Sequence, residues 1–262
     1  TYYLADGEGW INASDLSTTD NRIEDVQRVL NEKYNNQEHI SVYVKQLDTD
    51  RVAAINDEKS MYAASIAKLG VLYYAQERLS QKKLSLSNEY QYTSTVNGFP
   101  GAYDPDGSGK ISKMTDDKNY SLENLLKAVA QNSDNVATNI LGYYVANQYD
   151  NSFQKSVDKA SATSWNMDKK ELTARAAGTL MEAIYRQNGD IINYLSSTDY
   201  DGERISKNID VPVAHKIGDA YDFKHDVAIV YTDSPFILSI FTDKEGYDKI
   251  TSIADDVYGI LK

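Results

Sequence analysis

The most constraining feature of this sequence is a fifteen-residue stretch, Met61–Ala75, that is apolar or tyrosine except for one lysine and one serine. Ile66, Leu69 and Leu72 keep a helical spacing, so the stretch predicts a buried helix beginning near Ser65 and ending near Ser80. On such a helix Ser65 and Lys68 lie on one face, one turn apart. Apolar surroundings disfavour the ammonium form of a lysine and lower its pKa. A neutral amine beside a serine hydroxyl at a helix N-terminus can activate that hydroxyl as a nucleophile, which predicts an acyl-transfer enzyme.

A structural explanation of the same pair stays open at this point. The Ser-x-x-Lys spacing also occurs at Ser80/Lys83, Ser152/Lys155 and Ser156/Lys159, so the spacing alone has little specificity. Those three pairs lie in polar stretches, where the lysine is solvated. A buried helix can likewise hold a lysine whose stem is covered and whose ammonium reaches water. Further motifs are needed to distinguish a catalytic Ser65/Lys68 pair from a structural one.

Composition excludes several classes of function. The chain has 262 residues and a net charge of −12, which argues against nucleic acid or an anionic membrane as the main partner. It has no cysteine, and its only histidines are His39, His215 and His225. Disulfides and thiol nucleophiles are therefore excluded, and a histidine metal cluster or cofactor is not expected. No apolar run is long enough for a membrane span, and no basic-then-apolar leader opens the sequence. A leader or anchor outside this sequence stays compatible with export.

The order of predicted elements indicates an α+β fold. Strands are expected at 40–47, 52–55, 211–218, 226–232 and 236–242, and a closing helix at 250–261. Several helices, including one from Leu122 capped by Ser121, occupy the middle of the chain. We therefore expect an antiparallel sheet built from both chain ends, with flanking helices and an inserted all-helical lobe.

The first seventeen residues predict two short strands, Tyr2–Leu4 and Gly9–Ala13. The stretch Gly-Trp-Ile-Asn-Ala-Ser-Asp-Leu resembles the closing strand of the SH3-like repeats of bacterial wall-associated proteins. If residues 1–17 are the tail of such a repeat, the chain comes from a longer exported protein. Alternatively, residues 1–17 form an N-terminal strand of the main domain, which otherwise comprises residues 18–262.

Two later motifs change the interpretation of Ser65 and Lys68. Ser133-Asp134-Asn135 lies at a break between two predicted helices, and Lys216-Ile217-Gly218 ends a predicted strand. With Ser65-Ile66-Ala67-Lys68, this ordered set resembles the S-x-x-K, S-D-N and K-T-G elements of the class A β-lactamase and penicillin-binding protein superfamily. Tyr103-Asp104-Pro105 and Leu172-Thr173-Ala174-Arg175 also resemble family segments, at the cleft edge and after the omega loop. The resemblance covers Asn21 to Lys262 and implies a β-lactamase/transpeptidase-like fold.

The resemblance implies a role for each motif residue. Ser65 would be the nucleophile, Lys68 the general base, Ser133 the proton relay to the leaving nitrogen, and Lys216 a source of positive potential. The substrate-binding residues would be Asn135, Ile217, Gly218, Asp219 and Tyr103. Backbone N–H groups of Ser65 and Asp219 would stabilise the oxyanion, whereas Asp134 would hold its loop. No cofactor or metal is implied.

Two departures from the family pattern bear on the substrate. Ile217 replaces the family's threonine or serine, whose hydroxyl helps bind the substrate carboxylate. Lys224 or His225 could supply a cation instead, although an exposed charge at a strand end is the expected role of both. The family's omega-loop glutamate, which activates the deacylating water, has no counterpart between Asp150 and Leu172. Glu171 lies too late in the chain and is expected to be a helix-dipole partner.

The sequence therefore predicts an exported bacterial serine hydrolase or acyltransferase, extracellular or attached to the cell surface, that deacylates β-lactams slowly. Its substrate would be a peptidoglycan stem peptide or a related small acyl compound, and β-lactams are candidate ligands by resemblance. One alternative is a true β-lactamase with a displaced deacylation base. The other is a catalytically silent wall-binding or scaffolding module, against which the retention of five polar motif residues argues.

Overall fold

A computed structural model of the chain describes residues 2–5, 9–12 and 20–262. At the N-terminus, Tyr2–Ala5 (β1) pairs antiparallel with Gly9–Asn12 (β2), which confirms the two predicted strands as far as Asn12. Ala13 and the predicted boundary between residues 17 and 18 lie outside the described residues. The SH3-like origin of residues 1–17 stays a prediction.

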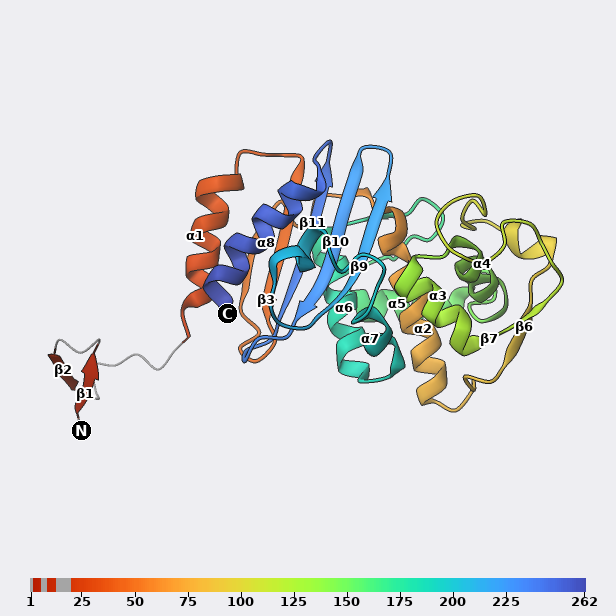
Figure 1. Cartoon of the computed structure of the whole chain (residues 1–262), viewed down its shortest axis with the longest axis horizontal. Coiled ribbons are helices and arrows are strands. Elements are labelled where there is room, and N and C mark those ends of the chain that lie inside the picture. Colours follow the sequence, from red (N-terminus) through yellow and green to blue (C-terminus); the bar gives the residue numbers. More distant parts are fainter. Residues whose placement is uncertain (1, 6–8, 13–19) are drawn as a thin grey trace.

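Five strands form one antiparallel sheet in the order β4-β3-β11-β10-β9. Their bounds are Ile40–Gln46 (β3), Val52–Ile55 (β4), Val213–Ala220 (β9), Phe223–Val230 (β10) and Phe236–Asp243 (β11). The sheet thus combines strands from both parts of the chain, as predicted (Figure 1). The fold class is confirmed: α+β with flanking helices and an inserted helical lobe.

One face of the sheet is covered by two helices from opposite ends of the chain, Arg22–Tyr34 (α1) and Tyr247–Leu261 (α8). Val26 and Leu30 of α1 and Ile253 of α8 are fully buried in the same apolar cluster as inward-facing residues of β3 and β11. The 3₁₀ helix Arg204–Asn208 (η4) closes this layer beside α8. Arg204 of η4 and Tyr247 of α8 extend from this layer to Asp219 near the end of β9.

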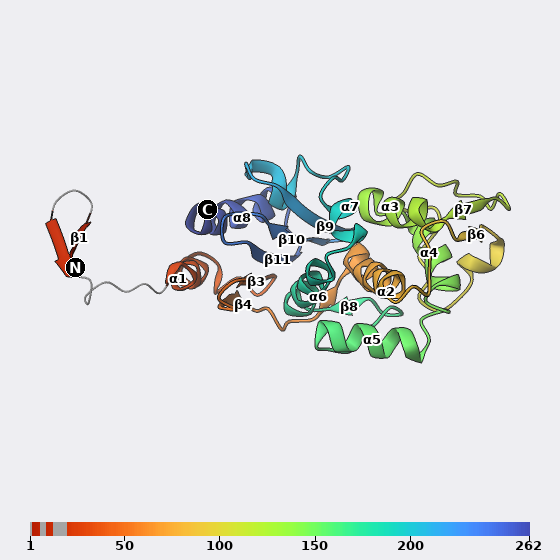
Figure 2. The same cartoon turned by 90° about the horizontal axis from the view of Figure 1, so that it is seen from below.

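The other face packs on a helical lobe (Figures 1 and 2). Its elements are the 3₁₀ helix Ala64–Lys68 (η2) and helices Leu69–Ser80 (α2), Leu122–Asn132 (α3), Asn135–Tyr144 (α4), Asn151–Ser161 (α5), Ala174–Gln187 (α6) and Asp190–Leu195 (α7). As predicted, Ser121 caps α3 by accepting a hydrogen bond from the backbone N–H of Asn124. Within the described part of the chain, no helix combines the length and apolar content that a membrane crossing needs.

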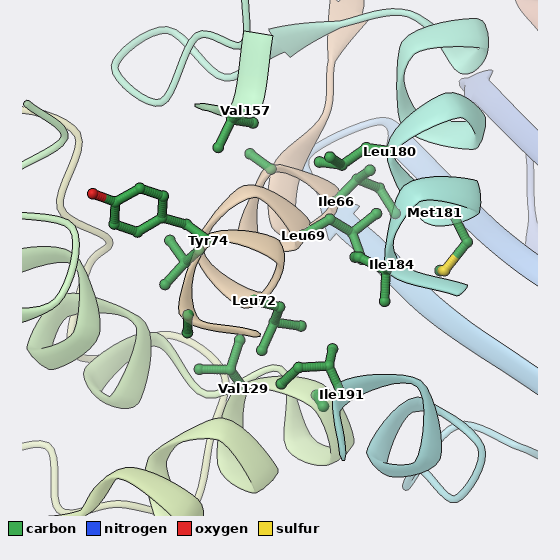
Figure 3. Packing of buried hydrophobic residues seen from close by; sticks show 14 of the residues in the cluster. Ile66, Leu69, Leu72, Tyr74, Val129, Val157, Leu180, Met181, Ile184 and Ile191 are labelled. Atoms are coloured by element: carbon green, nitrogen blue, oxygen red, sulfur yellow. The ribbon is translucent and has the colours of Figure 1, made fainter. Parts of the chain in front are cut away.

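Helix α2 is the centre of this lobe. Ile66, Leu69 and Leu72 are fully buried, and side chains from four other helices surround them, as Figure 3 shows. The predicted helix from Ser65 to Ser80 is therefore confirmed, with a 3₁₀ first turn in place of a regular α-helical one. Because side chains three residues apart eclipse on a 3₁₀ helix, Ser65 and Lys68 lie on the same side of the turn.

Two short strand pairings, of two and three residues, complete the fold and are not evident in the sequence. Met61–Tyr62 (β5) pairs with Glu171–Leu172 (β8), and Glu89–Gln91 (β6) pairs with Asn119–Ser121 (β7). A further 3₁₀ helix, Ser94–Asn97 (η3), lies in the long polar connection. The β5–β8 pair brings the segment before α6 against the turn that carries Ser65.

Candidate active site

The turn that carries Ser65 is fixed by contacts from two distant segments. Ala64 has a left-handed backbone conformation (φ 49°), which turns the chain sharply just before Ser65. The N–H of Ala63 donates to the carbonyl of Lys170 at 2.7 Å, and the hydroxyl of Tyr103 donates to the carbonyl of Ala64 at 3.1 Å. Ser65 is thereby placed at the wall of a pocket of about 240 Å³.

Lys68 lies fully buried beneath this pocket. Its Nζ donates to the carbonyl of Ser133 at 2.6 Å and to Oδ1 of Asn135 at 2.5 Å, and lies 3.4 Å from Oγ of Ser133. Burial, and then the neighbouring charge of Lys216, lowers the pKa of Lys68 well below its usual range. Burial therefore favours the neutral form of this amine more than it would be favoured in an exposed lysine. A neutral amine has two N–H groups, and both are used by these acceptors, so its lone pair is left free.

Ser133-Asp134-Asn135 forms the junction between α3 and α4. Ser133 ends α3 in a left-handed conformation (φ 54°), and the Asp134 side chain caps α4 by accepting from the N–H of Ala137 at 2.8 Å. The other Asp134 oxygen accepts from the N–H groups of Lys110 and Ile111 at 2.6 and 2.8 Å. Asp134 thus holds a neighbouring loop to the junction and frees Ser133 and Asn135 to face Lys68.

Lys216 extends from β9 to the same hydroxyl. Its Nζ donates to Oγ of Ser133 at 2.7 Å and to the carbonyl of Ile217 at 3.0 Å. Burial lowers the pKa of Lys216 to about 7, with a further lowering by Arg204 and an opposing effect of Asp226. Because the Ser133 hydroxyl accepts from Lys216, its own hydrogen remains available for donation.

Strand β9 approaches the Ser65 turn closely at Gly218. A Cβ at this position would lie 2.7 Å from the carbonyl oxygen of Ala63, which is closer than real Cβ atoms come. Glycine is therefore required by this contact. The sequence reading that Gly218 ends its strand is wrong, because β9 continues to Ala220 and pairs with β10 along its length.

The structure separates the predicted site residues into three groups. Ser65, Tyr103, Asn135 and Asp219 line the pocket. Lys68, Ser133 and Lys216 form the buried hydrogen-bonded row below it, and Gly218 fixes the distance between β9 and the Ser65 turn. Ile217 is buried and lies outside the pocket lining. Among the described residues, no group of histidine or acidic side chains is arranged to hold a metal ion.

Two polar residues of the site had no signal in the sequence. Ser108, in a loop expected only from its glycines, donates to the Ser133 carbonyl at 2.7 Å and lies 3.2 Å from Oδ1 of Asn135. Lys170 is buried, donates to the carbonyls of Gly101 and Met167 at 3.0 Å, and its Nζ lies 4.5 Å from the centre of the Tyr103 ring. Lys68 lies at the same distance from that ring. The contacts of Ser108 and Lys170 depend on how loops fold against distant segments, which no local sequence pattern predicts.

The expected strand-end charges at Lys224 and His225 are corrected by the structure. His225 is buried and stacks on Phe241 with ring centres 4.1 Å apart, and burial lowers its pKa to about 4. Its Nδ1 accepts from the N–H of Thr242, so the neutral ring donates through Nε2 to the carbonyl of Tyr62. Lys224 is an ion-pair partner of Asp219 at 2.8 Å.

Glu171, the acidic residue considered from the sequence, lies outside the Ser65 pocket. Glu171 lines a neighbouring hollow that shares only Tyr62 with the Ser65 pocket, and it is exposed in β8. The carboxylates that line the Ser65 pocket belong to Asp104 and Asp219. Asp104 accepts a hydrogen bond from the N–H of Asp106 at 2.9 Å.

The fold and this arrangement define the class of serine hydrolases with a Ser-x-x-Lys turn beside an antiparallel sheet. The Beta-lactamase enzyme family matches residues 21–261, so the chain belongs to that family. No curated protein matches the sequence. PBP-A is similar in structure with 14% identity and a TM-score of 0.74, covering 92% of this chain and 96% of that chain.

Two further solved structures show the same fold. A PBP-A mutant in acyl-enzyme complex with penicillin G has 15% identity and a TM-score of 0.73, over 92% of this chain and 96% of that one. A β-lactamase from Francisella tularensis has 17% identity and a TM-score of 0.70, over 92% and 98%. At these identities the structural similarity establishes the fold, and the chemistry depends on the residues of the site.

Proposed function

We propose that the protein is a serine acyl-transfer enzyme in which Ser65 is the nucleophile and Lys68 the general base. The observation that carries this proposal is the buried row of Lys68, Ser133 and Lys216, which meets the pocket that Ser65 lines through Asn135. Burying two lysines is unfavourable for stability, and neither forms an ion pair at hydrogen-bond distance among the described residues. A purely structural site would gain nothing from that cost.

The hydrogen bonds suggest the path of the proton. Ser65 Oγ attacks the acyl carbonyl and loses its proton to the free lone pair of Lys68, forming the ester bond of an acyl-enzyme. Lys68 then passes a proton to Ser133, and Ser133 gives its own to the leaving group as the scissile bond breaks. In the free protein the Ser65 hydroxyl has no hydrogen-bond partner among the described residues, so we expect this contact to tighten when substrate binds.

The acyl-enzyme is proposed to persist. Glu171 faces another hollow, Asp219 is engaged in ion pairs, and Asp104 is the remaining carboxylate at the pocket. Slow hydrolysis suits transfer to an amine or alcohol acceptor. By analogy with PBP-A, whose mutant is described as an acyl-enzyme with penicillin G, β-lactams and wall-peptide amides are the proposed substrates, and the cell exterior is the proposed location.

The testing experiment is an intact-mass time course with a fluorophosphonate probe and with benzylpenicillin, run on the wild type and on Ser65→Ala. We expect both reagents to add one adduct to the wild type and none to the variant, with a penicillin adduct that lasts for hours. Consumption of penicillin without a lasting adduct would favour β-lactamase turnover, with Asp104 as the displaced base. No adduct from either reagent would favour the silent binding module.

Gly218→Ala tests the spacing between β9 and the Ser65 turn. The new Cβ would lie 2.7 Å from a backbone oxygen, so the strand has to move away and displace the Asp219 N–H proposed as an oxyanion donor. We expect the rate of fluorophosphonate labelling to fall about 100-fold, since small displacements of reacting groups have effects of that size. Gly202→Ala is the matched control, because a Cβ there meets no atom within 4 Å. Equal labelling rates for both variants would contradict the proposed spacing.

A further inference from the structure

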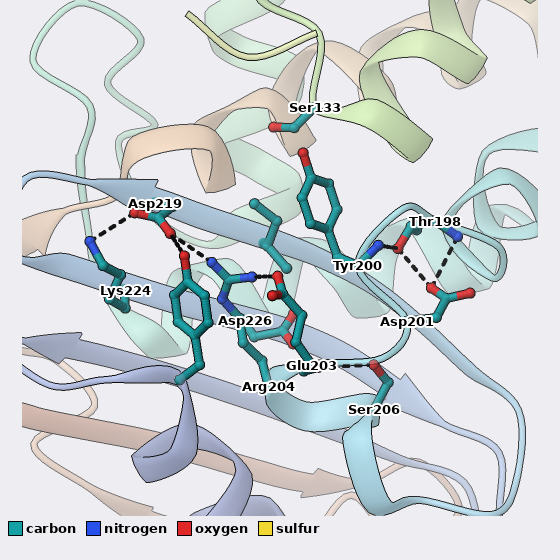
Figure 4. A network of polar contacts seen from close by, with 12 residues as sticks. Ser133, Thr198, Tyr200, Asp201, Glu203, Arg204, Ser206, Asp219, Lys224 and Asp226 are labelled. Atoms are coloured by element: carbon teal, nitrogen blue, oxygen red, sulfur yellow. Dashed lines mark hydrogen bonds and ion pairs between the residues drawn. The ribbon is translucent and has the colours of Figure 1, made fainter.

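The carboxylate of Asp219, which lines the pocket, forms ion pairs with two cations, Arg204 and Lys224. Nη2 of Arg204 lies 2.8 Å from one oxygen, and Nζ of Lys224 lies 2.8 Å from the other. The hydroxyl of Tyr247 donates to the first oxygen as well. Figure 4 shows Asp219 with Arg204 and Lys224. Burial raises the pKa of Asp219, but these partners outweigh that effect and hold the pKa below its usual value. The group is therefore an ionised carboxylate with its partners in place.

Arg204 is itself committed within the protein. It is 1% exposed, its guanidinium stacks 3.8 Å above the Tyr247 ring, and Nη1 contacts the carboxylate of Glu203. Lys224 donates in addition to the carbonyl of Tyr221 at 2.7 Å. Two cations, Arg204 and Lys224, thus face two carboxylates, Asp219 and Glu203, and the cluster has no net charge.

This cluster adjoins the reacting centre. Asp219 lines the same pocket as Ser65, and follows Lys216 by three residues on β9. The second carboxylate of the pocket, Asp104, adds negative charge on another wall. A substrate carboxylate arriving here would have to displace Asp219 from Arg204 and Lys224, and would leave a half-buried carboxylate without its partners.

We propose that Asp219 is an internal carboxylate that occupies Arg204 and Lys224, the two cations beside the pocket, so that the enzyme selects acyl substrates with no carboxylate next to the scissile bond. The preferred substrate class is then an ester or an internal amide that is uncharged at that position. Asp219 acts here as a specificity-determining residue. The inference rests on the proposed function, because it assumes that Ser65 is acylated.

The experiment compares acylation by benzylpenicillin and by its methyl ester, two probes that differ only in the carboxylate. Second-order rates are measured by intact mass for the wild type, for Asp219→Asn and for Asp222→Asn. Asp222→Asn is the matched control, because it removes the same charge three residues away. Asp222 is exposed and forms no ion pair among the described side chains. Thermal unfolding shows that each variant is folded, and fluorophosphonate labelling measures Ser65 independently of any carboxylate.

In the wild type and in Asp222→Asn we expect the methyl ester to acylate faster than the acid. In Asp219→Asn, Arg204 and Lys224 lose a charged partner, and the acid-to-ester rate ratio is expected to rise at least tenfold. The ratio cancels any change in Ser65 reactivity that affects both probes alike. An unchanged ratio in a folded, labelled Asp219→Asn would overturn this inference and leave the proposed function intact. Failure of all three reagents to modify Ser65 in any form of the protein would overturn the proposed function, and this inference with it.

Discussion

Lys68→Met is expected to lower the rate of Ser65 acylation about 1000-fold and, at the same time, to make the folded protein more stable. The rate falls because the variant has no base for the Ser65 proton, and general-base catalysis contributes factors of this order. The stability rises because an amine that is desolvated in the fold and protonated in the unfolded chain is replaced by an apolar side chain of similar size. Of the two former acceptors of Lys68, the Ser133 carbonyl keeps the hydroxyl of Ser108 as its donor at 2.7 Å. We expect a gain of about 1–2 kcal/mol in the free energy of unfolding near pH 7.

The pH dependence of that gain is a sharper test. The folded-state pKa of Lys68 lies below its unfolded value of 10.5, so the unfolded chain binds the extra proton and wild-type stability rises with pH toward 10.5. The difference between Lys68→Met and wild type should therefore shrink from pH 7 to pH 10, measured by urea unfolding. Lys155→Met is the matched control, since Ser152 and Lys155 repeat the same spacing with an exposed lysine. A destabilised Lys68→Met with undiminished labelling would contradict the assignment of a neutral catalytic base.

Much of this fold could be predicted because its pattern is local. The spacing of Ile66, Leu69 and Leu72 is a property of one helix, and Ser121 meets its cap partner three residues away. The late strands were also evident, but the start of β10 was missed. Its first residues, Phe223 to His225, are polar or mixed because they lie beside Asp219 and the Ser65 turn rather than in the apolar core. A hydrophobic pattern indicates which residues pack in an apolar core. A strand segment that packs beside a polar site lacks that pattern.

The candidate site was found by ordered motifs, and its supporting contacts were not. Lys68, Ser133 and Lys216 meet across 148 residues of chain, yet each is marked by its own short motif. Lys170, Ser108 and Arg204 have no motif of their own. Each acts through a backbone carbonyl or a carboxylate that only the folded chain brings near. His225 was expected to be an exposed charge, but it is buried against Phe241, and burial lowers its pKa to about 4.

His215→Leu is expected to destabilise the protein by about 3 kcal/mol at pH 6. His215 is buried in β9, where Nδ1 lies 3.0 Å from Asp226 and Nε2 lies 3.2 Å from Asp201. Burial lowers the histidine pKa, but the charge of Asp226 and the bond to Asp201 outweigh it and raise the pKa to about 9. Removing the imidazolium leaves Asp226 as a buried carboxylate whose remaining partner is the N–H of Ile205. Breaking one side of a buried ion pair has an effect of this size.

The sign of the pH effect distinguishes this ion pair from the lysines of the site. The folded-state pKa of His215 exceeds its unfolded value of 6.5, so the stabilisation is complete below pH 6.5 and is lost as pH rises through about 9. The stability difference between wild type and His215→Leu should therefore decrease over that range. The His215 contribution makes wild-type stability fall as pH rises, whereas the Lys68 contribution makes it rise. His39→Leu, at a half-exposed histidine paired with Glu245, is the matched control and should change stability by less than about 1 kcal/mol.

A double variant separates pairing from packing at the same place. If His215 stabilises the fold by compensating Asp226, then His215→Leu combined with Asp226→Asn should recover most of the lost stability, since the neutral amide can still accept from Ile205 and needs no cation. The double variant should also label more slowly at Ser65, even where its stability is recovered. The charge of Asp226 opposes the lowering of the Lys216 pKa, so its removal lowers that pKa further and reduces the positive charge that faces Ser133. Equal destabilisation by the single and double variants would show that the imidazole is needed for its shape alone, and the pH-dependent part of the difference would then be absent. The same carboxylate thus links the stability of the sheet edge to the charge of the lysine that faces Ser133.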